Sequence, residues 1–353
     1  AGALSVLFFY LFPVEGITPK TNLALFVLFF GMIEAGARSL FNRVIEKRFQ
    51  RNVVIVGLNP QSIELAQFLG NNPQLGYHLV CLVDIGASQS ERDSFSFHII
   101  RGAEHIADTI KDRGVDTIII SPEAYQVQAV IDVFYRSLEY RVDFFNLASF
   151  YEKMTGKIPL GAINQIWFLE NIMEGEKRPY ELAKRVFDIM FAIILGAITL
   201  VLLPFIALFI KLSSPGPIFY RQRRLGRAGK TFSLVKFRTM IVNDPAGGAE
   251  GTTGAVWTQE NDPRITRVGG FLRKTRVDEL PQVWDVLKGI LSFVGPRAER
   301  PEFHDLLKQR VPFYEERYLI KPGLTGWAQI NFRYGSSVAD SAEKLQYDLY
   351  YIK

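Results

Sequence analysis

An apolar run at 189–210, which contains no charged residue, is the feature that most constrains how this chain can fold. A single helix of this length can cross a bilayer. However, Lys184 precedes the run and Lys211 follows it, and cationic flanks favour the cytoplasmic side. Pro204 deletes one backbone hydrogen bond and clashes with the carbonyl four residues earlier. We therefore predict a re-entrant helix over 186–212 that breaks at Pro204 and returns to the same face; a spanning helix with a proline kink is the alternative.

Two further apolar stretches lie at the start of the chain, at 1–12 and 23–41. Lys20 alone precedes the second stretch. At the end of this stretch and after it, basic residues cluster: Arg38, Arg43, Lys47, Arg48 and Arg51. This asymmetry predicts transmembrane helices within 1–50 and places everything after them in the cytoplasm. The first stretch lacks the basic start of a signal peptide, so we expect earlier residues. A pair of buried core helices is the alternative.

The formal net charge of +5 suits an anionic partner, which can be phospholipid head groups, nucleotide phosphates or nucleic acid. Basic and aromatic side chains alternate after the apolar run: Phe219, Tyr220, Arg221, Arg223, Arg224, Arg227, Lys230 and Phe232. We expect them to dock on inner-membrane lipids. No nucleic-acid partner is expected, because that site would lie against the membrane. The single cysteine, Cys81, excludes an internal disulfide and suits a reducing compartment.

The middle of the chain, 51–175, alternates short β-rich runs with helical segments. The predicted strands are 53–56, 78–83 and 117–120, and the predicted helices are 61–69, 104–113 and 126–138. This alternation predicts a Rossmann-like, doubly wound α/β domain. Gly57 stands where a dinucleotide-binding turn begins, but the following glycines are replaced, and Asn59 is expected to cap a helix that starts at Pro60. A structural, dimerising or regulatory role is favoured over NAD binding.

Two adjacent carboxylates, Asp278 and Glu279, follow three cations within 273–276 and open a predicted helix at 280–287. The cations and the free N–H groups of the helix would hold the carboxylates ionised and gather phosphates around them. An ionised aspartate can attack phosphorus, and a neighbouring glutamate can hold a divalent cation. The alternative is that Asp278 is a helix N-cap and Glu279 an ordinary first-turn acid.

Several ordered motifs over about 181–353 resemble the monotopic phosphoglycosyl transferases, a family of bacterial sugar transferases. The motifs are Lys236-Phe237-Arg238-Thr239-Met240, Asn261-Asp262-Pro263-Arg264, Asp278-Glu279-Leu280-Pro281-Gln282, Gly295-Pro296-Arg297 and Lys321-Pro322-Gly323-Leu324-Thr325-Gly326-Trp327. The resemblance implies α/β architecture with membrane helices, and a mostly helical catalytic domain at 176–353. The N-terminal spans and degenerate Rossmann-like domain resemble the long form, which starts exopolysaccharide or O-antigen assembly.

The reaction implied by this resemblance is a sugar-phosphate transfer in two steps. Asp278 would attack the sugar-bearing phosphorus of a UDP-sugar, expelling UMP and leaving a phosphosugar on the enzyme. Polyprenyl phosphate would then attack this intermediate to give a polyprenyl diphosphate sugar. Glu279 would bind Mg²⁺. The motifs do not identify the sugar.

The resemblance also implies roles for the basic residues. Arg273 would meet the polyprenyl phosphate, and Arg297 the phosphates of the donor. Lys236 and Arg238 are predicted to be either structural or phosphate-facing, and Arg264 is a further candidate for substrate binding.

Two departures from the family pattern stand out. Ala298 replaces a second proline found in many relatives, and the chain stops at Lys353, where the family usually continues. Two other functions are considered: a non-catalytic membrane scaffold for polysaccharide assembly, and a nucleotide-sugar oxidoreductase built on the middle domain. A homodimer through that domain is compatible with each function.

Overall fold

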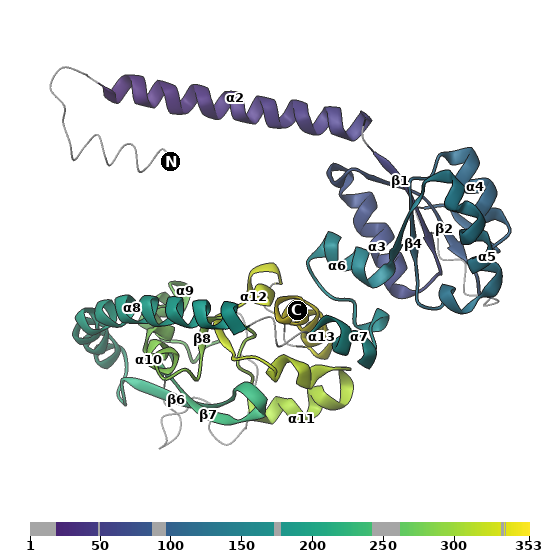
Figure 1. The fold of residues 1–353 in the computed structure, drawn as a ribbon. Coiled ribbons are helices and arrows are strands. Elements are labelled where there is room, and N and C mark those ends of the chain that lie inside the picture. The colour runs from purple at the N-terminus through teal and green to yellow at the C-terminus, as the bar shows by residue number, and fades with distance from the viewer. Residues whose placement is uncertain are drawn as a thin grey trace. The chain divides into compact units, whose positions relative to one another are not determined.

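The computed structural model describes residues 19–48, 50–86, 97–172, 178–241, 262–332, 335 and 337–353 (Figure 1). The chain divides into two compact units, Ala1–Phe150 and Tyr151–Lys353. The second unit begins before the boundary predicted at 175, because the segment from Tyr151 onward packs with the C-terminal helix α13 (Val338–Ile352). Ile158 and Trp167 share a hydrophobic cluster with Leu345 and other residues of α13.

Helix α2 (Pro19–Arg48) contains the apolar stretch predicted at 23–41. Its large apolar side chains between residues 25 and 40 are exposed, Phe26 and Ile33 each at 65%. Exposed side chains of this kind are expected of a helix whose solvent is lipid. The stretch predicted at 1–12 lies outside the described residues.

A five-stranded parallel sheet forms the core of the first unit, in the order β3-β2-β1-β4-β5. The strands are β1 (Arg51–Val56), β2 (Tyr77–Asp84), β3 (Ile99–Arg101), β4 (Thr117–Ile120) and β5 (Asp143–Asn146). The three strands predicted from the sequence are β1, β2 and β4, and all three are confirmed. Strands β3 and β5 are three and four residues long, and none of their residues is fully buried, so they lack the long apolar run that marks a central strand.

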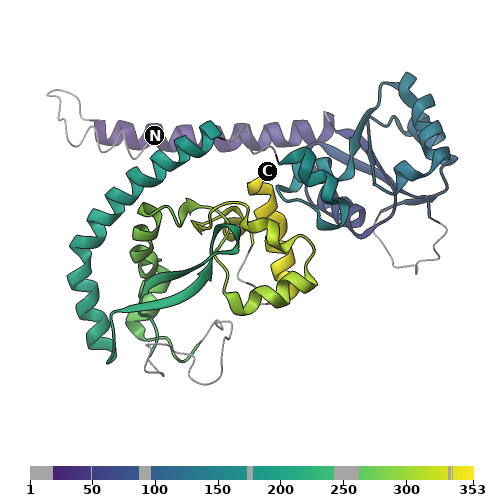
Figure 2. The ribbon, with the colours of Figure 1, turned by 60° about the horizontal axis from the view of Figure 1, so that its bottom comes forward.

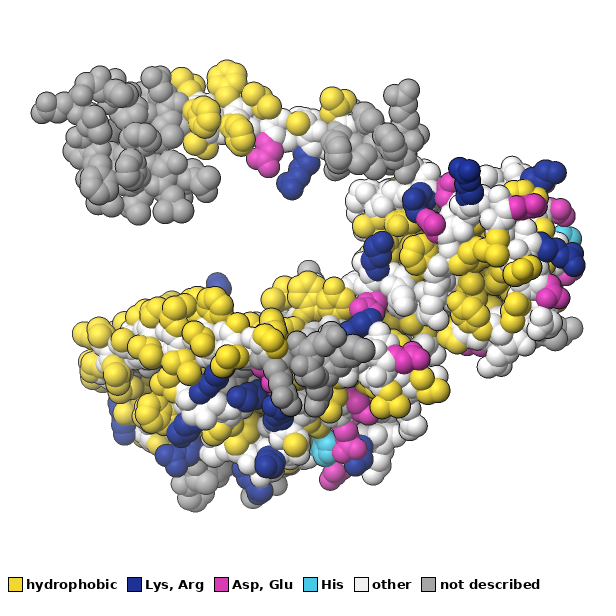
Figure 3. Space-filling view, in the orientation of Figure 1, with side chains coloured by type: hydrophobic (Ala, Val, Ile, Leu, Met, Phe, Trp, Pro, Cys, Tyr) yellow, Lys and Arg dark blue, Asp and Glu magenta, His cyan; other side chains and the backbone are white. Residues whose placement is uncertain are grey.

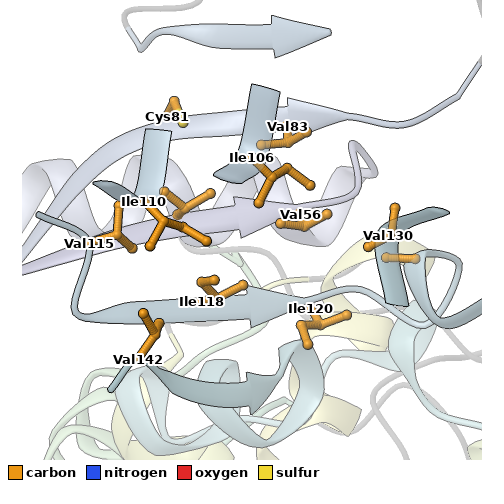
Figure 4. Packing of buried hydrophobic residues seen from close by; sticks show 12 residues of the cluster. Val56, Cys81, Val83, Ile106, Ile110, Val115, Ile118, Ile120, Val130 and Val142 are labelled. Carbon is orange, nitrogen blue, oxygen red and sulfur yellow. The ribbon is translucent and has the colours of Figure 1, made fainter. Parts of the chain in front are cut away.

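Helices flank this sheet on both faces, with α3 (Pro60–Asn71) on one and α4 (His105–Arg113) and α5 (Gln128–Ser137) on the other (Figure 1). Figure 4 shows how Val56 and Ile118 of the sheet pack with Ile106 of α4, in a cluster that also includes Val130 of α5. The predicted α/β domain with a parallel sheet is therefore confirmed.

The turn after β1 has the local chemistry that the sequence predicts. Gly57 has φ +104°, and a Cβ on it would lie 1.8 Å from Ser121 Oγ, so only glycine fits there. Asn59 caps α3: its Oδ1 accepts a hydrogen bond from Ser62 N at 2.8 Å, and Pro60 occupies the first turn. The helix cap therefore occupies the position where a dinucleotide-binding turn would have its glycines.

Helix α8 (Arg178–Ser213) carries the uncharged run and is the one helix, within the described ranges, that is long and apolar enough to cross a membrane. It is continuous through Pro204, so the predicted break is absent. Figures 1 and 2 show a strong bend along α8 instead. A proline bends a helix because it removes one hydrogen bond, and the remaining bonds keep the helix intact. Whether α8 returns to the same membrane face remains a prediction.

The rest of the second unit packs around α8. Its strands are β6 (Phe219–Leu225), β7 (Thr231–Phe237), β8 (Ser292–Val294) and β9 (Gly323–Thr325). Its other helices are α7 (Gln165–Asn171), α9 (Arg267–Lys274), α10 (Val283–Leu287), α11 (Pro301–Arg310) and α12 (Trp327–Asn331), and α6 (Leu147–Thr155) joins the two units. Ala192 of α8 packs on Val283 and Val286 of α10, whereas Ile206 and Ile210 pack on β7 and α9. Figure 3 shows apolar side chains gathered along α8, with Lys and Arg side chains on the adjoining surface.

Candidate active site

Asp278 and Glu279 lie in a 3₁₀ segment, Val277–Gln282, and each is only 7% exposed. Helix α10 begins after them, at Val283, so the predicted helix start at 280 is wrong. The residue that precedes the 3₁₀ segment is Arg276, in the left-handed region at φ +61°. The alternative role of Asp278 as a helix N-cap is therefore also wrong.

Glu279 is surrounded by cations that come from three different segments. Its Oε1 lies 3.0 Å from Lys236 Nζ at the end of β7 and 3.2 Å from Arg297 Nη2 after β8. Arg276 Nη1 lies 3.8 Å from the same oxygen. The structure thus brings together three residues predicted for the site, Lys236, Glu279 and Arg297, although more than forty positions separate Lys236 from Glu279.

These contacts determine the charge state of the cluster. Burial alone would raise the pKa of Glu279, but Lys236 and Arg297 outweigh it and lower that pKa to about 2. Burial and the neighbouring Arg297 lower the pKa of Lys236 to about 8, and Glu279 limits the fall. Glu279 is therefore ionised at every physiological pH, and Lys236 is the group of the cluster that can lose its proton near neutrality.

Asp278 differs from its neighbour, because its Oδ1 is buried without a hydrogen-bond partner. Burial raises the pKa of Asp278, and Glu279 adds to the rise, while Lys236 and Arg273 oppose it. The nearby cations therefore lower the pKa of Glu279, whereas at Asp278 burial outweighs them and the pKa rises. A desolvated carboxylate that no donor occupies is suited to act as a nucleophile when it ionises.

Arg273 lies in the last turn of α9. Thr266 caps that helix by accepting a hydrogen bond from Gly269 N at 2.9 Å. Gly269 allows close packing, because a Cβ there would lie 1.9 Å from Thr239 O. The cap and this close contact fix α9 against the backbone that follows β7, and Arg273 lies near enough to lower the pKa of Asp278.

Arg238 and Arg264 are not brought to the two carboxylates. Arg238 is 4% exposed and donates to Ser214 O at 2.7 Å and to Pro215 O at 3.1 Å, just after the end of α8. Arg264 pairs with Asp262 through two bonds of 2.8 and 2.6 Å. Of the two options predicted for Arg238, these contacts favour the structural one.

One arginine near the site, Arg317, was not predicted to belong to it, whereas Arg276 is one of the three cations that were expected to hold the carboxylates ionised. Arg317 is buried and donates to the backbone carbonyl of Arg297 at 3.1 Å. No local pattern connects Arg317 with Arg297, because the contact arises only in the folded chain.

A magnesium ion at this site would be held by Glu279 together with the phosphates of the substrate. Mg²⁺ commonly takes one or two carboxylates together with phosphate oxygens and water. Glu279 would supply one such carboxylate, next to Asp278, whose Oδ1 is unpartnered. Among the residues that the structure describes, no group of three or more His, Cys, Asp or Glu side chains is arranged for a metal. A cage made of protein ligands alone is therefore not present there.

Comparison with known proteins gives the same assignment as the motifs. The model of the bacterial sugar transferase family matches residues 179–353. An exopolysaccharide production protein of Rhizobium leguminosarum bv. phaseoli is 40% identical over 176 residues, covering 48% of this chain and 84% of the relative. This chain belongs to the bacterial sugar transferase family.

Two other members of the family are similar to larger parts of this chain. A UDP-N-acetylgalactosamine-undecaprenyl-phosphate N-acetylgalactosaminephosphotransferase of Aeromonas hydrophila is 38% identical over 205 residues, covering 57% of this chain and 46% of the relative. A UDP-glucose:undecaprenyl-phosphate glucose-1-phosphate transferase of Xanthomonas campestris pv. campestris is 30% identical over 321 residues, covering 86% of this chain and 63% of the relative. The chain thus spans about half to two thirds of these two relatives.

Proposed function

We propose that this chain transfers a sugar phosphate from a UDP-sugar to undecaprenyl phosphate, releasing UMP and forming a polyprenyl diphosphate sugar. The observation that carries this proposal is the buried carboxylate of Asp278, whose Oδ1 is unpartnered although Glu279 beside it is bound by three cations. The names of the Aeromonas and Xanthomonas relatives, which describe such transfers, support it.

The transfer proceeds through a phosphosugar bound to Asp278. A carboxylate oxygen of Asp278 attacks the sugar-bearing phosphorus, the bond from that phosphorus to the bridging oxygen breaks, and UMP leaves with the electron pair. An oxygen of undecaprenyl phosphate then attacks the same phosphorus, and the aspartyl–phosphorus bond breaks to restore the carboxylate. The two displacements balance without water or a redox partner. They also need no ternary complex of a water-soluble and a lipid substrate.

The cations of the site are assigned to the phosphates of the two substrates. Arg297, whose guanidinium lies beside Glu279, binds the donor's phosphates, and Arg273, near Asp278, meets the phosphate of the polyprenyl acceptor. Lys236 contributes positive charge and holds Glu279 in place. Mg²⁺, with Glu279 as its protein ligand, would supply further neutralisation of phosphate charge when bound.

The proposed topology places the catalytic unit on the cytoplasmic side of the inner membrane, with α8 entering and leaving through the same face. The support is the bend in α8 and the cations at both of its ends, including Lys184 and Lys211. Single cysteines introduced at 184 and 221 should both react with a membrane-impermeant thiol reagent added from the cytoplasmic side. Reaction from opposite sides would show that α8 spans the membrane.

The proposed reaction is tested with the full chain in detergent or vesicles, given undecaprenyl phosphate and one UDP-sugar at a time. UDP-glucose, UDP-galactose and their N-acetylated amino-sugar counterparts form the panel, and released UMP is measured. We expect catalytic UMP release with at least one donor, and only one equivalent or less without the acceptor. UMP release with none of the donors would contradict the proposal and favour the membrane scaffold. A nicotinamide-dependent absorbance change would instead favour the oxidoreductase.

A further inference from the structure

The segment 295–299, which carries Arg297, is held along its whole length by other parts of the second unit. Each of its five residues has a main-chain group bound by another segment. Three of these bonds are made by main-chain groups, of Thr325, Gly323 and Leu225, at 2.9 Å each. The other two come from arginine side chains: Arg317 Nη2 donates to Arg297 O at 3.1 Å, and Arg224 Nη1 donates to Ala298 O at 2.9 Å.

Arg317 is buried beside this segment, with 6% of its side chain exposed. Its charge is balanced by Asp348 Oδ2 of α13 at 2.9 Å and by Glu299 Oε1 at 3.4 Å. Its Nη1 also donates to Tyr314 Oη at 2.6 Å. A buried cation of this kind is costly unless it is paired and hydrogen-bonded, so its position is determined by these partners.

The partners of Arg317 come from three places in the sequence. Tyr314 precedes it in the same 3₁₀ turn, Asp348 lies in α13, and the carbonyl of Arg297 lies in the segment that faces the site. A planar guanidinium can donate in several directions from one rigid group, which a lysine ammonium on a flexible stem cannot reproduce. Arg317 thus connects the active-site segment to α13.

We infer that Arg317 is a positioning residue for the transfer, which fixes the main chain of Arg297 so that the Arg297 guanidinium stays beside Glu279. This inference rests on the proposed function and deepens it, because it assigns the geometry of the donor-phosphate site to a buried group that touches neither substrate. The link is short: Arg317 holds the carbonyl of Arg297, and Arg297 Nη2 lies 3.2 Å from Glu279 Oε1. A shift of about 1 Å in such a group can lower a rate about 100-fold.

A double-mutant cycle tests this inference. Arg317→Lys keeps the charge and should lower kcat/KM for the UDP-sugar about 10- to 100-fold, with the rate of UMP release in a single turnover as readout. If Arg317 acts through Arg297, the same change in an Arg297→Lys background should cost less than about threefold, because the positioned group is already altered. Multiplicative effects of the two substitutions would overturn the inference.

A structural control separates positioning from a general loss of stability. Glu343→Gln breaks a buried ion pair of the same unit, in which Lys157 Nζ lies 2.6 Å from Glu343 Oε1. Its effect on UMP release should multiply with that of Arg297→Lys. If thermal melting shows that Arg317→Lys is not folded, Asp348→Asn replaces it in the cycle. Asp348→Asn removes the charge that orients Arg317, so its effect should likewise be non-additive with that of Arg297→Lys.

The outcomes distinguish this inference from the proposed function. Wild-type protein that releases no UMP from any donor would contradict the proposed function itself. Active wild-type protein with multiplicative effects in the cycle would leave the transfer intact and overturn the role of Arg317 alone.

Discussion

Asp278→Asn is expected to lower kcat/KM for UMP release at least about 1,000-fold, because an amide does not attack phosphorus. Asp278 Oδ1 makes no hydrogen bond, so the isosteric amide removes no contact at that oxygen and the protein should still fold. UMP release with saturating undecaprenyl phosphate measures the activity, and thermal unfolding in the same detergent measures the stability. Retention of substantial activity would rule out the covalent mechanism.

The control for this variant is Asp285→Asn, at another buried aspartate of the same unit. Burial raises the pKa of Asp285 as it does that of Asp278, and Asp285 lies on α10, beyond the cation cluster. We expect the control to keep activity within about threefold of wild type. Mass spectrometry of wild-type protein mixed with donor alone should find the phosphosugar on Asp278. An adduct on another side chain would contradict the proposed role of Asp278.

Glu279→Gln is expected to lower kcat/KM about 100-fold or more and to destabilise the second unit by about 2–3 kcal/mol. The glutamine keeps the shape but removes the charge that compensates Lys236 and Arg297, whose side chains are 17% and 29% exposed. Glu302→Gln is the matched control, because Glu302 also pairs with an arginine but is 51% exposed. A surface pair contributes about 0–1 kcal/mol, so the control should change little.

The pH dependence of these proteins gives a second measurement. The pKa of Glu279 falls from its ordinary value of 4.5 to about 2 on folding, so its stabilisation is present above pH 4.5 and is lost as the pH falls through about 2. Glu279→Gln should lack this acid-dependent loss. Because Glu279 helps to keep the pKa of Lys236 as high as about 8, the variant's remaining activity should decline with rising pH earlier than that of wild type. An unchanged alkaline decline would show that Lys236 does not need its proton.

Elements with strong local patterns were predictable from the sequence. The strands β1, β2 and β4 have apolar runs that need burial on both faces, and Asn59 with Pro60 has the residue preferences of a helix start. The short strands β3 and β5, the start of α10 and the boundary at Tyr151 were not predicted. In each case the structure depends on packing against distant segments, as when the segment after Tyr151 packs on α13.

The sequence by itself determined which residue types are available for the chemistry: two adjacent carboxylates, several cations and an apolar run long enough to enter a membrane. Only the tertiary structure decided which of these groups contact one another and which stay without a partner. It places Lys236 and Arg297 on Glu279, leaves Asp278 Oδ1 without a partner, and directs Arg238 to the end of α8. The physical reason is that pairing and desolvation depend on distances between residues far apart in the chain, which local sequence patterns do not encode.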